Sequence, residues 1–321
     1  MKKIYYLLIG MCCCLNLMVA DAAELLPDVA IAERGQHVVI NIPQARLFLF
    51  EDGKLLNIFP TGAGKPKTQT PLGEYTITEK RNKPTWYIPA SIQKERAAKG
   101  DPDVKFIRYG EPGHPLGPVF VRFGEPKLGL GIHGTSAPSS VPGWPSHGCV
   151  RLRNENALKF AKTVEIDTPV SVIHQRYALN QDDDGQLWLA VYPNKYSVKN
   201  DLKEELLIAL EQWSTQNDAQ IDQERLKKIL GKQVRSLCLT CTDKKPKVSG
   251  ELHPIAWTDG LAQIRLPADM SKMQLEDDVP HTIQDGEEKI DYSSHEGWIT
   301  PGDGQELLPS NVTQDNLEGL F

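Results

Sequence analysis

Short runs of alternating or β-branched apolar residues dominate the chain between residues 37 and 196. Such runs are typical of strands, and here they predict strands at 38–42, 46–50, 54–60, 74–79, 119–123, 128–133, 168–173 and 185–192. Helical spacing occurs twice in this part, over 91–99 and over 151–164, where Asn154 is a suitable cap. The pattern therefore predicts a mostly β domain with one or two short helices.

Two stretches between these strands lack such a pattern. Residues 61–65 are rich in glycine but lack the Gly-Lys-Ser/Thr ending of a phosphate loop, so we expect a flexible connection there. Residues 83–117 contain five prolines. A loop of this length inside a compact domain is usually functional. We expect a lid or a binding wall, in which Trp86 and Tyr87 either stack on a substrate or pack internally.

The pattern changes after residue 200. Apolar residues at helical spacing predict helices over 201–214 and 221–230. Shorter strand-like pieces follow, near 255–257, 262–266 and 289–292. We therefore expect a smaller α/β C-terminal module over 201–321, and the sequence states no role for it.

The N-terminus has the layout of a secretory signal peptide. Two lysines precede an apolar run over 4–20, and small residues at Ala20 and Ala22 offer a cleavage site. We predict a signal peptide over 1–22 and a linker over 23–36; retention as an uncleaved anchor is the alternative. Lipid attachment at the three adjacent cysteines of the run is disfavoured, because a bulky methionine precedes them where lipoprotein signals have a small residue.

Composition narrows the class of protein. The 321 residues are 40% hydrophobic and 24% charged, which is usual for a globular protein. The formal net charge of −6 lacks the basic footprint that nucleic-acid binding requires. We therefore predict no nucleic-acid partner.

Export changes how the six cysteines are read, because three of them lie in the signal peptide. Cys238 and Cys241 are close enough in sequence to form a disulfide in an oxidising compartment. A redox pair or a zinc site with His253 or His281 is a weaker alternative. Cys149 is then left as an unpaired thiol, which marks it as a candidate nucleophile.

The surroundings of Cys149 favour that role. It follows His147 and Gly148, and His133 lies sixteen positions upstream. A thiol needs a base or a positive environment to become a thiolate, and histidine is the usual base. A zinc site made of these two histidines and the cysteine would lack a fourth ligand at a recognisable spacing. A buried cysteine with two satisfied histidines is the remaining alternative.

These residues carry a family resemblance. His133-Gly134-Thr135 followed, after a fixed gap, by Ser-His-Gly-Cys-Val-Arg-Leu-Arg-Asn over 146–154 resembles the signature of the L,D-transpeptidases with a YkuD-type catalytic domain. The segments 70–73, 84–86 and 115–117 resemble the same domain. The resemblance covers 37–175.

The resemblance implies a YkuD-like β-sandwich over 37–175 that needs neither a cofactor nor a metal. Residues 176–200 would form a closing hairpin and linker, and 201–321 lies outside the family pattern. The implied substrate is the tetrapeptide stem of peptidoglycan, outside the membrane and in the periplasm. A wall-linked lipoprotein is a second implied partner, and the C-terminal module would bind another component of the cell envelope.

Roles for individual residues follow from the same resemblance. Cys149 would attack the carbonyl of the third, diamino-acid residue and expel the terminal D-alanine, and an amine would then resolve the thioester. His133 would be the base, and the carbonyl of Gly134 would orient its ring. Water in place of the amine would make the protein an L,D-carboxypeptidase or a hydrolase that releases wall-bound protein. A non-catalytic wall-binding module is the rival from another class.

Four further residues are expected to bind substrate or support the loop. Backbone N–H groups near His147, Gly148 and Cys149 would hold the oxyanion. Arg151 would fix a carboxylate or carbonyl of the substrate, or form an ion pair that orders the loop. Ser146 would support the loop by a hydrogen bond or contact the substrate. We do not expect His147 to be the base, because related sequences also have glutamine at its position.

Overall fold

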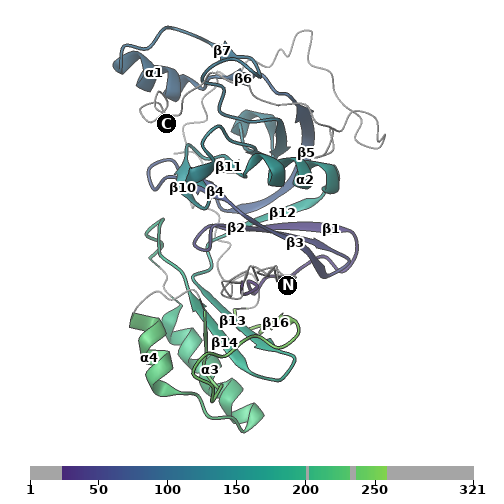
Figure 1. The fold of residues 1–321 in the computed structure, drawn as a ribbon, viewed down its shortest axis with the longest axis vertical. Coiled ribbons are helices and arrows are strands. Elements are labelled where there is room, and N and C mark those ends of the chain that lie inside the picture. The colour runs from purple at the N-terminus through teal and green to yellow at the C-terminus, as the bar shows by residue number, and fades with distance from the viewer. Residues whose placement is uncertain (1–23, 200–201, 232–235, 259–321) are drawn as a thin grey trace, which may run out of the picture.

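The computed structural model describes residues 24–199, 202–231 and 236–258. The described residues form two β-rich bodies that follow one another along the chain (Figure 1). The predicted signal peptide, the expected strands at 262–266 and 289–292, and His281 lie outside the described residues. No helix of the described part is long and apolar enough to cross a membrane.

The first body is built on a ten-stranded sheet in the order β10-β4-β11-β9-β8-β5-β12-β1-β2-β3. Its strands are β1 (Gln36–Asn41), β2 (Arg46–Glu51), β3 (Lys54–Pro60), β4 (Gly62–Gly64), β5 (Gly73–Asn82), β8 (Val119–Phe123), β9 (Gly131–His133), β10 (Gly143–Ser146), β11 (Val150–Arg151) and β12 (Pro169–Ile173). The predicted mainly β character is confirmed. The part described contains four α-helices.

The glycine-rich segment 61–65 is not the flexible connection we expected. Its centre forms strand β4, which pairs with β10 and β11. A Cβ at Gly64 would lie 2.3 Å from the carbonyl oxygen of Thr68. The glycines therefore permit close packing of backbone on backbone. Their lack of a side chain, which suggested a flexible connection, here allows a paired strand.

The proline-rich segment 83–117 forms a small subdomain at one end of the molecule (Figure 1). It contains β6 (Trp86–Tyr87), β7 (Phe106–Ile107) and helix α1 (Ala90–Ala98), which confirms the predicted helix at 91–99. The rings of Tyr87 and Phe106 lie 6.0 Å apart, and both side chains remain partly exposed.

Helix α2 (Asn154–Thr163) covers the apolar face of the sheet and confirms the second predicted helix. It buries Ala157, Phe160 and Ala161 in the main core. Its C-terminal carbonyls are satisfied by Lys80, whose Nζ donates to Ala161 O at 3.2 Å and Val164 O at 2.7 Å. A cation at a helix C-terminus is favourable both as a donor and towards the helix dipole.

The second body has a four-stranded sheet in the order β15-β14-β13-β16, with helices α3 (Lys203–Asn217) and α4 (Gln223–Gly231) packed on it. Its strands are β13 (Tyr177–Asp182), β14 (Leu187–Val191), β15 (Leu237–Cys238) and β16 (Leu252–Pro254). Both helices form near the predicted ranges. The strand expected at 255–257 is absent from those residues, and β16 lies just before them.

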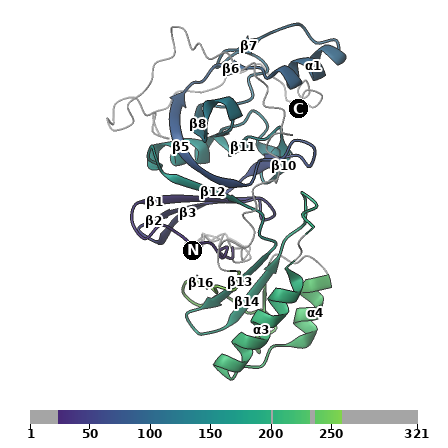
Figure 2. The same ribbon diagram turned by 180° about the vertical axis from the view of Figure 1, so that it is seen from behind.

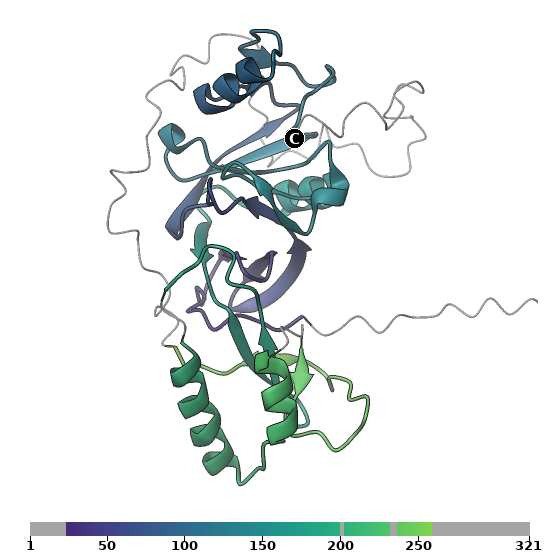
Figure 3. The same cartoon turned by 90° about the vertical axis from the view of Figure 1, so that its left-hand side faces the viewer.

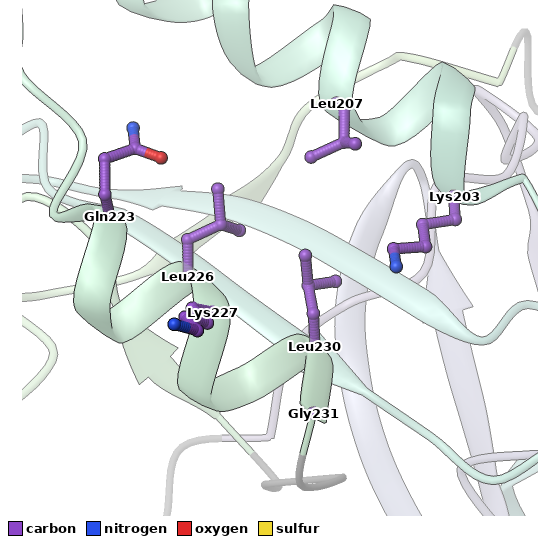
Figure 4. Close-up of a pocket in the computed structure, with 7 residues that line it drawn as sticks. All are labelled: Lys203, Leu207, Gln223, Leu226, Lys227, Leu230 and Gly231. Carbon is purple, nitrogen blue, oxygen red and sulfur yellow. The ribbon is translucent and has the colours of Figure 1, made fainter.

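The hairpin β13–β14, expected to close the first body, pairs instead with β15 and β16. One face of β14 explains this difference. Leu187, Leu189 and Val191 pack with apolar residues of α3 and α4, so the hairpin needs those helices to bury its side chains. A groove of about 420 Å³ between the two helices has Leu207 and Leu230 in its lining (Figure 4).

The residues after 23, expected as a linker, are packed between the two bodies in the structure. Leu25 is fully buried. Asp28 Oδ2 accepts hydrogen bonds from Trp257 N at 2.9 Å and from Thr258 N and Oγ1 at 2.8 Å. Leu26 is held by the side-chain amide of Asn180. Figure 3 shows this purple segment beside the second body.

Candidate active site

Strand register places the candidate catalytic residues on one face of the first sheet. Strand β11 runs parallel to β9, with Val150 opposite Ile132 and Arg151 opposite His133. Side chains alternate between the two faces along a strand. Arg151, His133 and the preceding Cys149 therefore share a face, while Val150 and Ile132 point into the core with α2. Figure 2 shows β11 and β8 in the middle of this sheet.

His133 is held as a neutral imidazole. Its side chain is buried, and Nδ1 lies 2.6 Å from Gly134 O. A carbonyl only accepts, so Nδ1 carries the proton and Nε2 is the basic nitrogen. Burial, with a further contribution from the positive charge of Arg151, lowers the pKa of His133 to about 4. The hydrogen bond to Gly134 O acts in the other direction and raises this pKa in part. The ring is therefore unprotonated near pH 7.

The Gly134 carbonyl is fixed by a tight cluster around Asn154. A Cβ at Gly134 or at Gly117 would lie 2.4 Å from Asn154 Oδ1, so both positions require glycine. That oxygen accepts a hydrogen bond from Thr135 N at 2.8 Å. Asn154 was expected to cap α2, but the capping position is taken by Arg153 without a side-chain bond. Asn154 instead supports the backbone that orients His133.

The loop before the nucleophile is closed by Ser146. Its Oγ donates to Cys149 O and accepts from Gly148 N at 3.2 Å. Gly148 has φ +121°, a conformation that side chains rarely adopt. Ser146 therefore supports the loop, and the N–H of Gly148 is engaged within it.

The thiol of Cys149 is partly exposed and donates to Gly129 O at 3.3 Å. Burial raises the pKa of the Cys149 thiol. A hydrogen bond with the backbone of Gly131 and the positive charges of Arg122 and Arg151 lower this pKa in part. The hydrogen bonds of the described residues include none between this thiol and His133. The structure therefore holds a neutral thiol and a neutral imidazole that are not hydrogen-bonded to each other.

His147 and Arg151 make contacts with different segments. His147 Nε2 is 3.3 Å from Glu95 Oε2 of α1, so it connects the loop to the proline-rich subdomain. Burial lowers the pKa of His147, Lys65 adds to this effect, and Glu95 opposes it. Arg151 is 8% exposed and donates to Ser140 Oγ at 3.4 Å, while its buried Nε has no hydrogen-bond partner among the described residues.

Comparison with known proteins identifies this part of the chain. Residues 35–172 match the family model of the L,D-transpeptidase catalytic domain, YkuD. These residues belong to the YkuD-type L,D-transpeptidase family. The match includes the whole constellation around Cys149 and His133.

Curated relatives agree with this assignment. The chain is 31% identical over 170 residues to the probable L,D-transpeptidase ErfK/SrfK of Escherichia coli (strain K12), covering 52% of each chain. It is also 31% identical over 170 residues to the probable L,D-transpeptidase YbiS of the same strain, covering 52% of this chain and 53% of the relative. The chain spans about half the length of these relatives. The solved L,D-transpeptidase from Mycobacterium smegmatis is 24% identical over 43% of this chain and 58% of its own, with a TM-score of 0.33.

The structure adds residues of the YkuD-type domain that sequence reasoning missed. Phe120 lies opposite His133 in the β8–β9 ladder, with ring centroids 6.0 Å apart and planes 14° apart. Arg122 Cζ lies 5.3 Å from the centroid of Phe120, and Arg122 Nε donates to Glu79 Oε2 at 3.1 Å. The alternation over 119–123 predicted a strand but did not say which face meets the histidine.

The glycine at the start of β9 makes this stack possible. A Cβ at Gly131 would lie 2.1 Å from Cζ of Phe120, so the ring occupies the space that a side chain would take. The aromatic ring therefore lies over Gly131 and against the imidazole.

Metal and disulfide chemistry lie apart from this site. No three His, Cys, Asp or Glu side chains of the described residues are grouped to hold a metal ion. The structure joins Cys238 to Cys241 in a disulfide in the second body. Cys149 is the free cysteine of the described part.

Proposed function

We propose that the protein is an exported L,D-transpeptidase that forms an acyl-enzyme on Cys149 with a tetrapeptide stem of peptidoglycan. The observation that carries the proposal is the shared sheet face of Cys149 and a neutral, carbonyl-oriented His133 within the YkuD-type domain. A nucleophile and a base with a fixed tautomer are the two groups that acyl transfer through a thioester needs.

The first half-reaction uses the groups already described. The thiol leaves Gly129 O and gives its proton to His133 Nε2, and Sγ attacks the carbonyl carbon of the diamino-acid residue. The N–H groups of His147 and Cys149 are the oxyanion donors we propose, because Gly148 N–H is engaged by Ser146. His133 then protonates the nitrogen of the leaving D-alanine as the C–N bond breaks.

The second half-reaction reverses these proton movements. An acceptor amine loses a proton to His133 and attacks the thioester carbon, and the thiol is regenerated. The thioester stores the energy of the cleaved peptide bond, so no nucleotide is needed outside the membrane. The acceptor we propose is the amine of another stem or of a wall-linked protein. Arg151 fixes a substrate carboxylate or carbonyl. The reason for this assignment is that its Nε has no hydrogen-bond partner within the part of the chain that the structure describes.

Purified reduced protein incubated with tetrapeptide-containing muropeptides tests this function. Mass spectrometry should show dimers joined between two diamino-acid residues, together with released D-alanine. Cys149→Ala and His133→Asn should abolish the dimers, whereas His253→Asn, at an exposed histidine of the second body, should retain them. Cross-links formed by Cys149→Ala would overturn the nucleophile assignment.

The same samples separate the rival functions. Tripeptide with no dimer would mean that water resolves the thioester, as in a carboxypeptidase. Release of protein from wall fragments would indicate a hydrolase. A reduced protein that forms no covalent adduct with a carbapenem would favour a non-catalytic wall-binding module.

A further inference from the structure

The chain returns to the first body between the hairpin β13–β14 and helix α3. In this connector, residues 192–198, the side-chain amide of Asn194 bonds both backbone groups of Val198, at 2.8 and 2.9 Å. Tyr196 is 6% exposed and packs with the main core of the first body. The connector lies beyond residues 35–172, which match the YkuD-type domain. Its contacts with the first body are therefore additional to that domain.

The hydroxyl of Tyr196 closes the turn formed by residues 64–70. It accepts a hydrogen bond from Thr70 N at 2.9 Å and donates one to Gly64 O at 3.0 Å. Both of these residues are buried, so the hydroxyl satisfies two backbone groups that lack access to water. Burial raises the pKa of Tyr196, although its hydrogen bonds with Thr70 lower it in part, and the hydroxyl keeps the proton that it donates. The imidazole of His174 stacks on the ring, with centroids 5.8 Å apart.

The same turn contacts the start of the nucleophile loop, residues 146–149. Ser146 O accepts hydrogen bonds from Lys65 N at 2.9 Å and from Thr68 Oγ1 at 3.1 Å. Ser146 Oγ in turn donates to Cys149 O. Hydrogen bonds thus connect the Tyr196 hydroxyl, through the turn and Ser146, to the backbone of the nucleophile.

We infer that Tyr196 is a positioning residue, which holds the nucleophile loop in place through the 64–70 turn. The inference rests on the proposed function and adds to it a role for the segment that follows the YkuD-type domain. Acylation requires Sγ of Cys149 and the proposed backbone donors of the oxyanion to meet at one carbonyl group. A small displacement of the loop therefore slows acylation even where the thiol stays accessible.

Removal of the hydroxyl alone tests the inference. Tyr196→Phe keeps the ring in the core and the stack on His174, but it leaves Gly64 O and Thr70 N without the partner that they share. Buried backbone groups without a partner are unfavourable. The turn should therefore shift, and the nucleophile loop should shift with it.

Two reactions of Cys149 separate positioning from general damage. A carbapenem acylates Sγ as the C–N bond of its β-lactam ring breaks and the thiol proton passes to the ring nitrogen, and the oxyanion formed on the way needs the backbone donors. Iodoacetamide alkylates Sγ as iodide leaves, without an oxyanion. Tyr196→Phe should lower the rate of acylation by about tenfold, a part of the loss that removal of an oxyanion donor causes, and should leave alkylation nearly unchanged. Loss of the folded state would change both rates.

Matched variants show whether the effect follows this path. Thr68→Val removes the hydroxyl that donates to Ser146 O, so it should lower the ratio of acylation to alkylation as well. Its effect should be smaller in a Tyr196→Phe background than in the wild type, because both changes release the same turn. Tyr177→Phe, at a buried tyrosine of the second body, should leave the ratio unchanged.

Hydrogen exchange measures the same coupling without catalysis. In Tyr196→Phe the amides of 64–70 and 146–149 should exchange about fivefold faster, the scale of one lost hydrogen bond. Unchanged exchange at 36–51, in β1 and β2, verifies that the variant is folded. Unchanged exchange at 146–149 would overturn the inference, as would an unchanged ratio of the two rates. A wild-type protein that the carbapenem does not acylate would count against the proposed function, and exchange would then decide the role of Tyr196.

Discussion

The contact between Gly131 and Phe120 gives the sharpest prediction about the site. A methyl group at residue 131 would lie 2.1 Å from Phe120 Cζ and 2.4 Å from Cε2, and all three of its nearest neighbours are atoms of that ring. Gly131→Ala should therefore force the ring to move. Overpacking of this kind costs about 1–3 kcal/mol, and loss of the stack on His133 costs about 0.5–1.5 kcal/mol more. We expect the free energy of unfolding to fall by about 2–4 kcal/mol.

A double-mutant cycle isolates this contact. In a Phe120→Ala background the added methyl group meets no ring, so Gly131→Ala should cost almost nothing and gain slightly in strand propensity, by about 0.5–1 kcal/mol. Urea unfolding of the four proteins measures the coupling, which we expect to be at least about 2 kcal/mol. Gly131→Ala should also slow acylation of Cys149, because the displaced ring no longer holds the imidazole. An equal cost of Gly131→Ala in both backgrounds would refute the steric account.

Three further predictions concern stability and pH. Lys80→Met removes both donors to the carbonyls at the end of α2 and should lower the free energy of unfolding by about 2–3 kcal/mol in urea titrations; an unchanged midpoint would contradict the capping role. His133 has a folded pKa of about 4 against about 6.5 unfolded, so the unfolded chain binds more protons in between. Stability should therefore rise by roughly 3 kcal/mol from pH 4 to 6.5 and then level off, and His133→Asn should lose this part of the rise. Asp28→Ala frees three donors of residues 257–258 and should make the junction of the two bodies more sensitive to limited proteolysis, whereas unchanged cleavage would show that this tie is dispensable.

Local pattern was sufficient for the longer elements of the first body, but it did not predict the short strands β4, β6, β7, β10 and β11. The period-2 runs and the helical spacing at 91–99 and 151–164 predicted strands and helices that the structure contains, because side chains that face a core must repeat with the period of their element. The spacing of histidine and cysteine likewise selected Cys149 and His133. These two residues end or adjoin strands, so chemistry and periodicity pointed to the same segments.

Pairing between distant segments was decided only by tertiary structure. The sequence did not show that β13 and β14 join the second sheet, that 61–65 forms a strand, or that Asp28 meets residue 258. Each depends on which surfaces lie within reach after the chain has folded back on itself. Local patterns specify that a face is apolar, but not which other apolar face will cover it.

The environment of the nucleophile shows the same division. Sequence alone determined which thiol is unpaired and which histidine has the matching motif. Register brought Phe120, Arg122 and Glu79 to the face of Cys149, and burial, together with the charge of Arg151, lowered the pKa of His133. Residue identity is a local property. Strands far apart in the chain decide which neighbours share a residue's face of the sheet and how far burial desolvates its side chain.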